Sequence, residues 1–121
     1  EFLSKHPKAE DVCYPTLKGD KYFDIAMKYL PNGSCGVVSF GVKGGRAAAE
    51  AFMKNLKIFA IETHVADARS CCLHPASSTH RQLTEEELVA AGISGNLVRM
   101  SCGLENTQDL LDDVAQALDA I

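Results

Sequence analysis

The stretch LTEEELVAAGISGNLVRMSCG, residues 83–103, places a helix signal directly before a strand signal. Thr84 and Glu87 are spaced as a capping box, in which each side chain accepts a hydrogen bond from the other residue's backbone amide, and leucines on both sides form a hydrophobic staple. Gly92 stands where such a helix ends. The following NLVRMSCG is typical of a strand. This part of the chain therefore predicts a short helix that leads straight into a sheet.

The rest of the chain continues this alternation of helices and strands. We expect helices at residues 21–30, 46–56 and about 108–118, and strands at residues 11–14, 35–42, 57–63, 70–74 and 96–103. The interleaved order favours an α/β chain folded as an α+β two-layer sandwich, with one small, mostly antiparallel or mixed sheet and helices packed on it. In the last helix we expect Asp109, Asp112 and Asp113 to face solvent.

Size and charge exclude several classes of protein. The 121 residues suffice for one domain with a single core. Twelve scattered basic residues against 16 acidic ones predict neither nucleic-acid nor membrane binding, and no apolar run approaches the roughly 20 residues of a membrane span. Five cysteines without a C-x-x-C pattern indicate reduced thiols in a cytoplasmic protein. The opening EFLSKHP is typical of a helix end stopped by Pro7, so we expect a longer protein upstream.

The segment RSCCLHPASSTHRQL, residues 69–83, gathers several groups that could carry chemistry. His74 and His80 have no zinc-site spacing, and adjacent Cys71 and Cys72 on a strand point to opposite faces, so we expect no metal site. A cysteine nucleophile with a histidine base stays open. The simpler interpretation is a strand end and a rigid loop in which Ser and Thr side chains hydrogen-bond to nearby backbone.

Arg99 lies in the middle of an apolar strand. Alternation places it on one face with Leu97 and Ser101, opposite Val98 and Met100. A buried arginine is costly unless an anion meets it, and the planar guanidinium suits both oxygens of a carboxylate. An internal ion pair with Asp or Glu, or a solvated sheet face, also stays open, and the residues alone favour these alternatives.

Two other features have a structural and a functional interpretation. Gly41, Gly44 and Gly45 precede a helix but match no phosphate-binding pattern, which favours a tight strand-to-helix turn. His64 follows a strand and is either a proton carrier or a polar loop residue. The residues do not separate these two roles.

Three blocks of sequence resemble one known family. KYLPNGSCGVVSFGVKGG, HVADARSCCLHPASSTHRQLTEEEL and AAGISGNLVRMSCGLEN resemble, in order, the C-terminal domain of the Cys/Met-metabolism family of pyridoxal-phosphate enzymes. KYLPNG and FGVKGG are more similar to its O-acetylhomoserine sulfhydrylase branch. The resemblance implies that residues 1–121 are a single C-terminal substrate-binding domain whose pyridoxal-phosphate-binding large domain is absent. It also implies a cytoplasmic homo-oligomer, of the homotetramer type.

The resemblance assigns roles to particular residues. Arg99 would hold the α-carboxylate of the amino-acid substrate. His64 stands where relatives carry Ser or Asn near the cofactor and could donate a hydrogen bond to substrate, and Ala66 stands where Gly is common. The lysine that forms the Schiff base with pyridoxal phosphate belongs to the absent domain, so this chain should contain no catalytic residue and should be inactive alone.

The resemblance also implies a reaction. The whole enzyme would be a transferase that replaces the acetate of O-acetylhomoserine by sulfide to make homocysteine, as in methionine biosynthesis. The alternatives within the family are methionine γ-lyase, cystathionine γ-lyase and cystathionine γ-synthase. An alternative of another class is a free-standing, non-catalytic interaction module.

Overall fold

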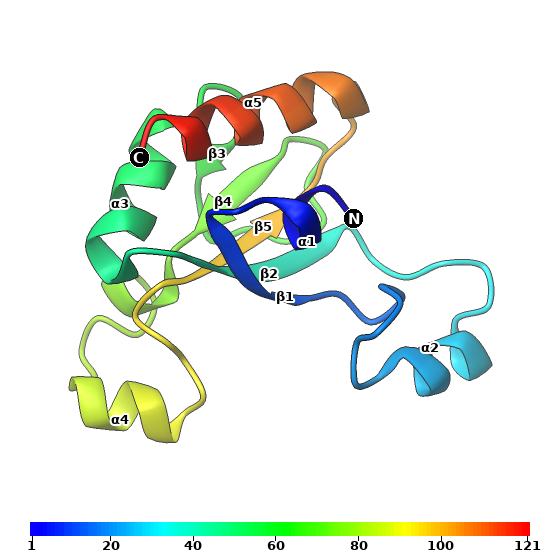
Figure 1. Cartoon of the computed structure of the whole chain (residues 1–121), viewed down its shortest axis with the longest axis horizontal. Coiled ribbons are helices and arrows are strands. Elements are labelled where there is room, and N and C mark those ends of the chain that lie inside the picture. Colours follow the sequence, from blue (N-terminus) through cyan, green and yellow to red (C-terminus); the bar gives the residue numbers. More distant parts are fainter.

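One five-stranded mixed sheet organises the chain (Figure 1), and the computed structural model describes residues 1–121. The strand order is β1-β2-β5-β4-β3, and every neighbouring pair is antiparallel except β3 and β4. The expected α+β sandwich with a small mixed sheet is confirmed. The elements along the chain are α1 (Phe2–Lys5), β1 (Ala9–Cys13), α2 (Phe23–Tyr29), β2 (Val37–Val42), α3 (Gly45–Asn55), β3 (Ala60–Ile61), β4 (Cys71–Leu73), the 3-10 turn η1 (Pro75–Ser77), α4 (Glu85–Ala90), β5 (Leu97–Ser101) and α5 (Thr107–Asp119).

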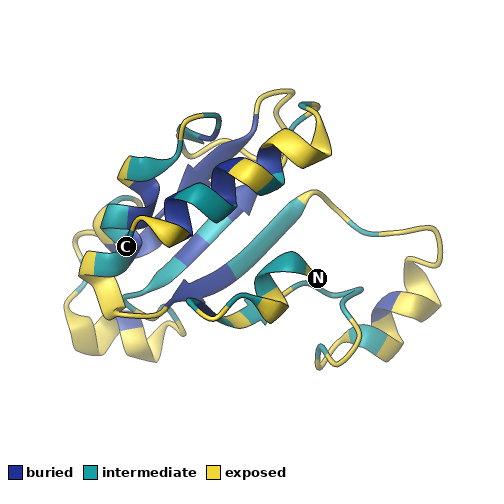
Figure 2. Ribbon diagram, turned by 45° about the horizontal axis from the view of Figure 1, so that its top comes forward, coloured by how far each residue is buried: buried dark blue, intermediate teal, exposed yellow.

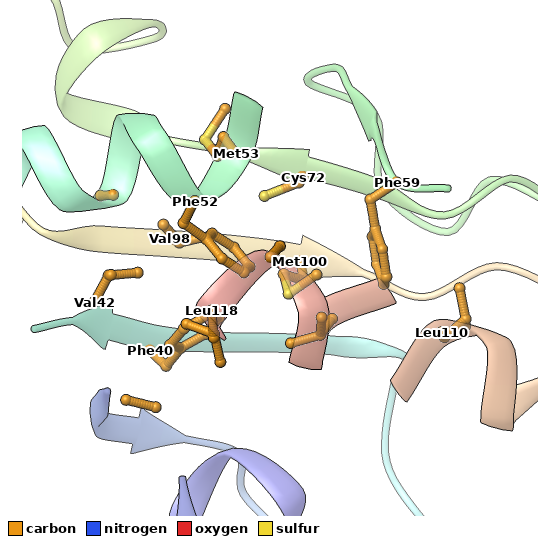
Figure 3. Packing of buried hydrophobic residues seen from close by; sticks show 14 residues of the cluster. Phe40, Val42, Phe52, Met53, Phe59, Cys72, Val98, Met100, Leu110 and Leu118 are labelled. Atoms are coloured by element: carbon orange, nitrogen blue, oxygen red, sulfur yellow. The ribbon is translucent and has the colours of Figure 1, made fainter. Parts of the chain in front are cut away.

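The hydrophobic core lies between the sheet and helices α3 and α5, which cover one of its faces (Figures 1 and 2). Phe40 of β2 and Phe52 of α3 meet edge to face with ring centroids 5.7 Å apart (Figure 3). Burial of one such side chain contributes about 1.5–3 kcal/mol to folding. Other core residues include Val42, Met53, Phe59, Cys72, Val98, Met100, Leu110, Val114 and Leu118.

The pairing of the central strands decides which side chains face away from the helices. On β5, Val98 and Met100 are buried in the core. Because side chains alternate along a strand, Arg99 lies on the opposite face. Its direct neighbours across the ladders are Ser39 of β2 and Leu73 of β4. The face expected for Arg99 from alternation is therefore the observed one, and no helix of the α3–α5 layer covers it.

The capping box and the glycine at the helix end, both expected in residues 83–103, are present in the structure. Thr84 Oγ1 accepts the amide of Glu87 at 3.3 Å, and Glu87 Oε2 accepts the amide of Thr84 at 2.8 Å, so the capping box is complete. Gly92 follows the helix with a φ of +72°, a conformation in which glycine is favoured. Gly44, with a φ of +106°, begins the tight turn from β2 into α3.

Two expectations about α5 and the strand before β4 were wrong. Asp113 was expected in solvent, but it is only 4% exposed. Its carboxylate accepts the backbone amides of Lys57 and Ile58 at 2.8 Å and that of Phe59 at 3.3 Å. These amides are therefore unavailable to the sheet, which explains why the strand expected at residues 57–63 is reduced to Ala60–Ile61.

Helix α2 belongs to an arm, residues 14–35, that extends away from the sheet (Figures 1 and 2). Tyr14 closes the base of the arm, since its hydroxyl donates to the carbonyl of Cys35 at 2.8 Å. The helix is where its apolar spacing predicted it, but of its residues only Ala26 is buried, and Tyr29 is 69% exposed. No helix of the chain has the length and apolar character needed to cross a membrane.

Candidate functional site

Arg99 lies on the sheet face opposite α3 and α5 and extends towards the loop of residues 62–69, which follows β3 and covers part of this face. Its Nη2 donates to the carbonyl oxygens of Thr63 at 2.9 Å and His64 at 3.3 Å. The five ion pairs of the domain involve other residues, so Arg99 meets no Asp or Glu. The internal ion pair that the sequence left open does not form.

The guanidinium of Arg99 has unused hydrogen-bonding capacity. Its Nε is buried and has no acceptor. A buried donor without a partner costs about 1–3 kcal/mol, and charged donors cost more. No Asp or Glu of the domain neutralises the guanidinium, so it keeps a positive charge without an anionic partner, in addition to the unpaired N–H. A carboxylate fits these requirements.

His64 lies in the loop that Arg99 contacts. Its Nδ1 is 2.9 Å from Oε2 of Glu62, and its side chain is 66% exposed. The hydrogen bond with Glu62, followed by the negative charge of that carboxylate, raises the pKa of the His64 imidazole. Arg99 and His64, the two site residues expected from the sequence, are thus brought together through the carbonyl of His64. Glu62 was missed, although its position two residues before His64 on an extended segment indicates the same side of the chain.

Cys71 and Ser101 hold the same loop against the sheet. The Cys71 thiol donates to the carbonyl of His64 at 3.0 Å, and Ser101 Oγ accepts the amide of Ala66 at 3.0 Å. Burial raises the pKa of the Cys71 thiol, and it raises that of Cys72 to about 12. Both thiols therefore stay protonated, which argues against a cysteine nucleophile. Cys72 points into the core, as expected for adjacent strand residues.

Ala66 adopts an unfavourable backbone conformation in this loop, with a φ of +58°. A side chain in the left-handed region costs about 1–2 kcal/mol, and glycine avoids most of this strain. We expect Ala66→Gly to raise the free energy of unfolding by about 0.5–1 kcal/mol after the entropy cost of glycine, measured by urea denaturation. Ala68→Gly in the same loop is the control and should lower stability. Equal losses in both variants would show that Ala66 is unstrained.

A carboxylate network closes the base of the loop. Glu105 accepts the amide of Ser70 at 2.8 Å and its hydroxyl at 2.7 Å, and the Ser70 hydroxyl oxygen accepts the amide of Gly103 at 2.8 Å. The hydrogen bonds from Ser70 lower the pKa of Glu105. The network fixes the end of the loop to the end of β5, and so restricts where Arg99 and His64 can move.

The HPASSTH motif is structural. His74 is fully buried, and its Nε2 is 2.8 Å from the carbonyl of Gly95 while its Nδ1 is 2.7 Å from Ser77 Oγ. Since a carbonyl only accepts, Nε2 carries the proton and Nδ1 accepts from the serine. Ser78 donates to the carbonyl of His74 at 2.6 Å. The expected loop with hydrogen-bonded serine side chains is present, and η1 within it packs beside β5.

A cavity of the domain lies elsewhere. It has a volume of about 490 Å³ and lies on the helix side, where residues of α1, Met100 and the start of α5 line it. Arg99 does not line this cavity. We place the candidate site at Arg99 because the cavity is mostly apolar and its two acidic residues, Glu1 and Glu105, already contact Lys5 and Ser70, whereas no Asp or Glu neutralises the Arg99 guanidinium. No group of three or more His, Cys, Asp and Glu side chains is placed to hold a metal ion.

The Arg99 face provides no amine for a Schiff base. None of the strands β1, β2, β4 and β5 contains a lysine. Lys8, which precedes β1, donates to carbonyl oxygens at the end of α5. The residues around Arg99 therefore fit the acid group of a substrate, and these strands offer no lysine for the aldehyde of pyridoxal phosphate.

The mixed sheet with helices packed on one face is consistent with a domain of fold-type I pyridoxal-phosphate enzymes. The chain belongs to the Cys/Met metabolism PLP-dependent enzyme family, whose model matches residues 1–119. The resemblance inferred from the motifs is confirmed, and pyridoxal phosphate is the cofactor of the family.

Known proteins of this family resemble the chain along nearly its whole length. A crystal structure of an O-acetylhomoserine (thiol)-lyase from Campylobacter jejuni, with N′-pyridoxyl-lysine-5′-monophosphate, has a TM-score of 0.89 and 39% identity over 98% of this chain and 28% of its own. O-acetyl-L-homoserine sulfhydrylase of Leptospira meyeri is 46% identical over 98% of this chain, and L-methionine gamma-lyase of Fusobacterium nucleatum subsp. polymorphum is 42% identical over 100%. The chain spans only 27% and 30% of these two relatives.

Proposed function

We propose that this chain is the substrate-binding part of a longer O-acetylhomoserine sulfhydrylase, which replaces acetate by sulfide and forms homocysteine. The observation that carries the proposal is the Arg99 guanidinium, which lies on the sheet face opposite α3 and α5 without a carboxylate partner and with a buried, unpaired Nε. The sulfhydrylase of Leptospira meyeri, at 46% identity, supports the choice of reaction.

In this proposal the residues of the chain bind and orient the substrate. Arg99 binds the α-carboxylate, and its bonds to the carbonyls of Thr63 and His64 hold the guanidinium in place. The His64 imidazole donates a further hydrogen bond to the substrate. Pyridoxal phosphate, which a lysine of the large domain would hold, would supply the electron sink for the reaction when bound. The role of this chain is to fix the acid end of the substrate so that its γ carbon is correctly placed.

The large domain and the other subunits of a homo-oligomer would cover the Arg99 face in the whole protein. Covering the face removes water from around the guanidinium and so strengthens its attraction for a carboxylate. A free-standing interaction module is the weaker alternative, because it would not explain why the Arg99 guanidinium has no acidic partner and an unpaired Nε.

The test is an assay of the full-length enzyme loaded with pyridoxal phosphate. We expect homocysteine from O-acetylhomoserine and sulfide, with little methanethiol from methionine under the same conditions. Predominant release of methanethiol and ammonia from methionine would instead support a methionine γ-lyase, which the 42% identity to such an enzyme keeps as the second candidate. If the enzyme converted none of O-acetylhomoserine, methionine and cystathionine, the proposal would be contradicted.

A further inference from the structure

Glu62 and His64 form a carboxylate–imidazole pair beside the candidate carboxylate-binding residue. The 2.9 Å contact joins Glu62 Oε2 to His64 Nδ1. The carbonyl of the same histidine accepts hydrogen bonds from Arg99 and from the Cys71 thiol. The pair is thus attached to Arg99 through one peptide group, while Nε2 of His64 makes no hydrogen bond within the domain.

The contact with Glu62 decides the proton arrangement of the imidazole. A carboxylate only accepts, so Nδ1 carries a proton and Nε2 is the nitrogen left free to face a ligand. Glu62 also favours the cationic ring, and Asp67 acts weakly in the same direction, so the pKa of His64 is raised. The other groups packed against this segment are the Arg99 guanidinium, which bonds to the His64 carbonyl, and the neutral Cys71 thiol.

We propose that Glu62 is a positioning residue that holds His64 as a Nδ1-protonated cation, so that the substrate carboxylate is bound by an imidazolium together with the Arg99 guanidinium. The inference rests on the proposed function, because it takes the carboxylate of the amino-acid substrate as the anion. It adds a pH dependence. As the pH rises through the pKa of His64, the imidazolium loses its charge and the site retains Arg99 alone.

The first test measures the histidine directly and needs no catalysis. The exchange rate of the imidazole Cε1–H of His64, followed by mass spectrometry across pH in the whole enzyme without substrate, reports its pKa. Glu62→Gln removes the charge but keeps an acceptor, whereas Glu62→Leu removes both. We expect the pKa of His64 to fall in both variants and to fall further in Glu62→Leu. An unchanged pKa would overturn the inference.

The second test separates positioning from general structure through steady-state kinetics. Glu62→Gln should raise the KM for the amino-acid substrate about threefold near neutral pH, the size expected for loss of one partly solvated charge pair. The turnover number kcat should change less than KM. The pH at which KM begins to rise should be lower than in the wild type, because the pKa of His64 is lower in the variant. Glu62→Asp, which keeps the charge, should restore much of the affinity. A KM that rises equally at every pH would overturn the inference, because the charge would not act through His64.

A matched control is available near the two ends of the chain. Asp119 Oδ1 lies 3.8 Å from Nε2 of His6, far along the chain from the candidate site. Asp119→Asn should leave KM and its pH dependence unchanged. A rise in KM as large as that of Glu62→Gln would overturn the inference. The loss of any carboxylate would then raise KM, and the effect would not be specific to Glu62.

The outcomes for Glu62 and Arg99 distinguish the two proposals. If Arg99→Ala weakens substrate binding while Glu62→Gln does not, the carboxylate site stands and the role of Glu62 is wrong. If neither variant affects KM, both are wrong. The pKa of His64 could depend on Glu62 while KM depends on neither Glu62 nor Arg99. The Glu62–His64 pair would then form without binding the substrate carboxylate, and the inference would also be overturned.

Discussion

Arg99→Ala in the full-length enzyme raises the KM for the amino-acid substrate about 100-fold, equivalent to a loss of about 3 kcal/mol in binding free energy. The physical reason is that a carboxylate desolvated at this site loses its cationic partner and both directed N–H donors. Steady-state kinetics measure the effect. The absorption of bound pyridoxal phosphate should persist, because the Schiff-base lysine is expected in the large domain.

Arg99→Lys is the matched control for charge. Lysine keeps the positive charge but lacks the planar fork that can bind both oxygens of a carboxylate at once. We expect its KM to lie between those of the wild type and Arg99→Ala. If Arg99→Ala binds substrate normally in an enzyme that is folded and loaded with cofactor, Arg99 does not hold the carboxylate.

Asp113→Ala lowers the free energy of unfolding by about 3 kcal/mol. The substitution leaves the amides of Lys57, Ile58 and Phe59 without their acceptor at a site that is only 4% exposed in the native protein. Each buried, unpaired amide costs about 1–3 kcal/mol, and water entering the space left by the side chain recovers part of this. Urea denaturation followed by circular dichroism measures the loss.

Two variants test the mechanism of this destabilisation. Asp113→Asn keeps one acceptor oxygen and should lose less stability than Asp113→Ala. Asp112 is exposed and accepts only from the Gln108 side chain, at 2.7 Å, so Asp112→Ala should cost less than about 1 kcal/mol. Similar losses at positions 112 and 113 would mean that helix propensity, rather than the buried amides, accounts for the effect.

Much of the fold could be predicted from short-range patterns. The capping box at Thr84 and Glu87 decides the start of α4 because both partners lie within one turn of helix. The alternation along Leu97–Ser101 placed Arg99 opposite Val98 and Met100, since successive strand side chains point to opposite faces. The burial of Asp113 could not be predicted in this way, because its partners lie more than 50 residues away in sequence.

The residues of the candidate site were chosen from the sequence and remain a prediction, whereas their contacts could not be predicted. The family resemblance singled out Arg99 and His64, and the direction of Arg99 followed from strand alternation. The role of the His64 carbonyl as the acceptor shared by Arg99 and Cys71 was not predicted, because it depends on how the loop of residues 62–69 folds over β4 and β5. The left-handed conformation of Ala66 belongs to the same loop.

The amino-acid sequence by itself determined the order and kind of the elements, the family, and the face of β5 that carries a charge. These properties depend on helical and strand periodicity and on motifs of adjacent residues. Only the tertiary structure decided that the Arg99 guanidinium meets backbone carbonyls instead of an internal carboxylate, and that Glu62 pairs with His64. The physical reason is that hydrogen bonds require particular atoms within about 3 Å of one another, and packing of distant segments sets those distances.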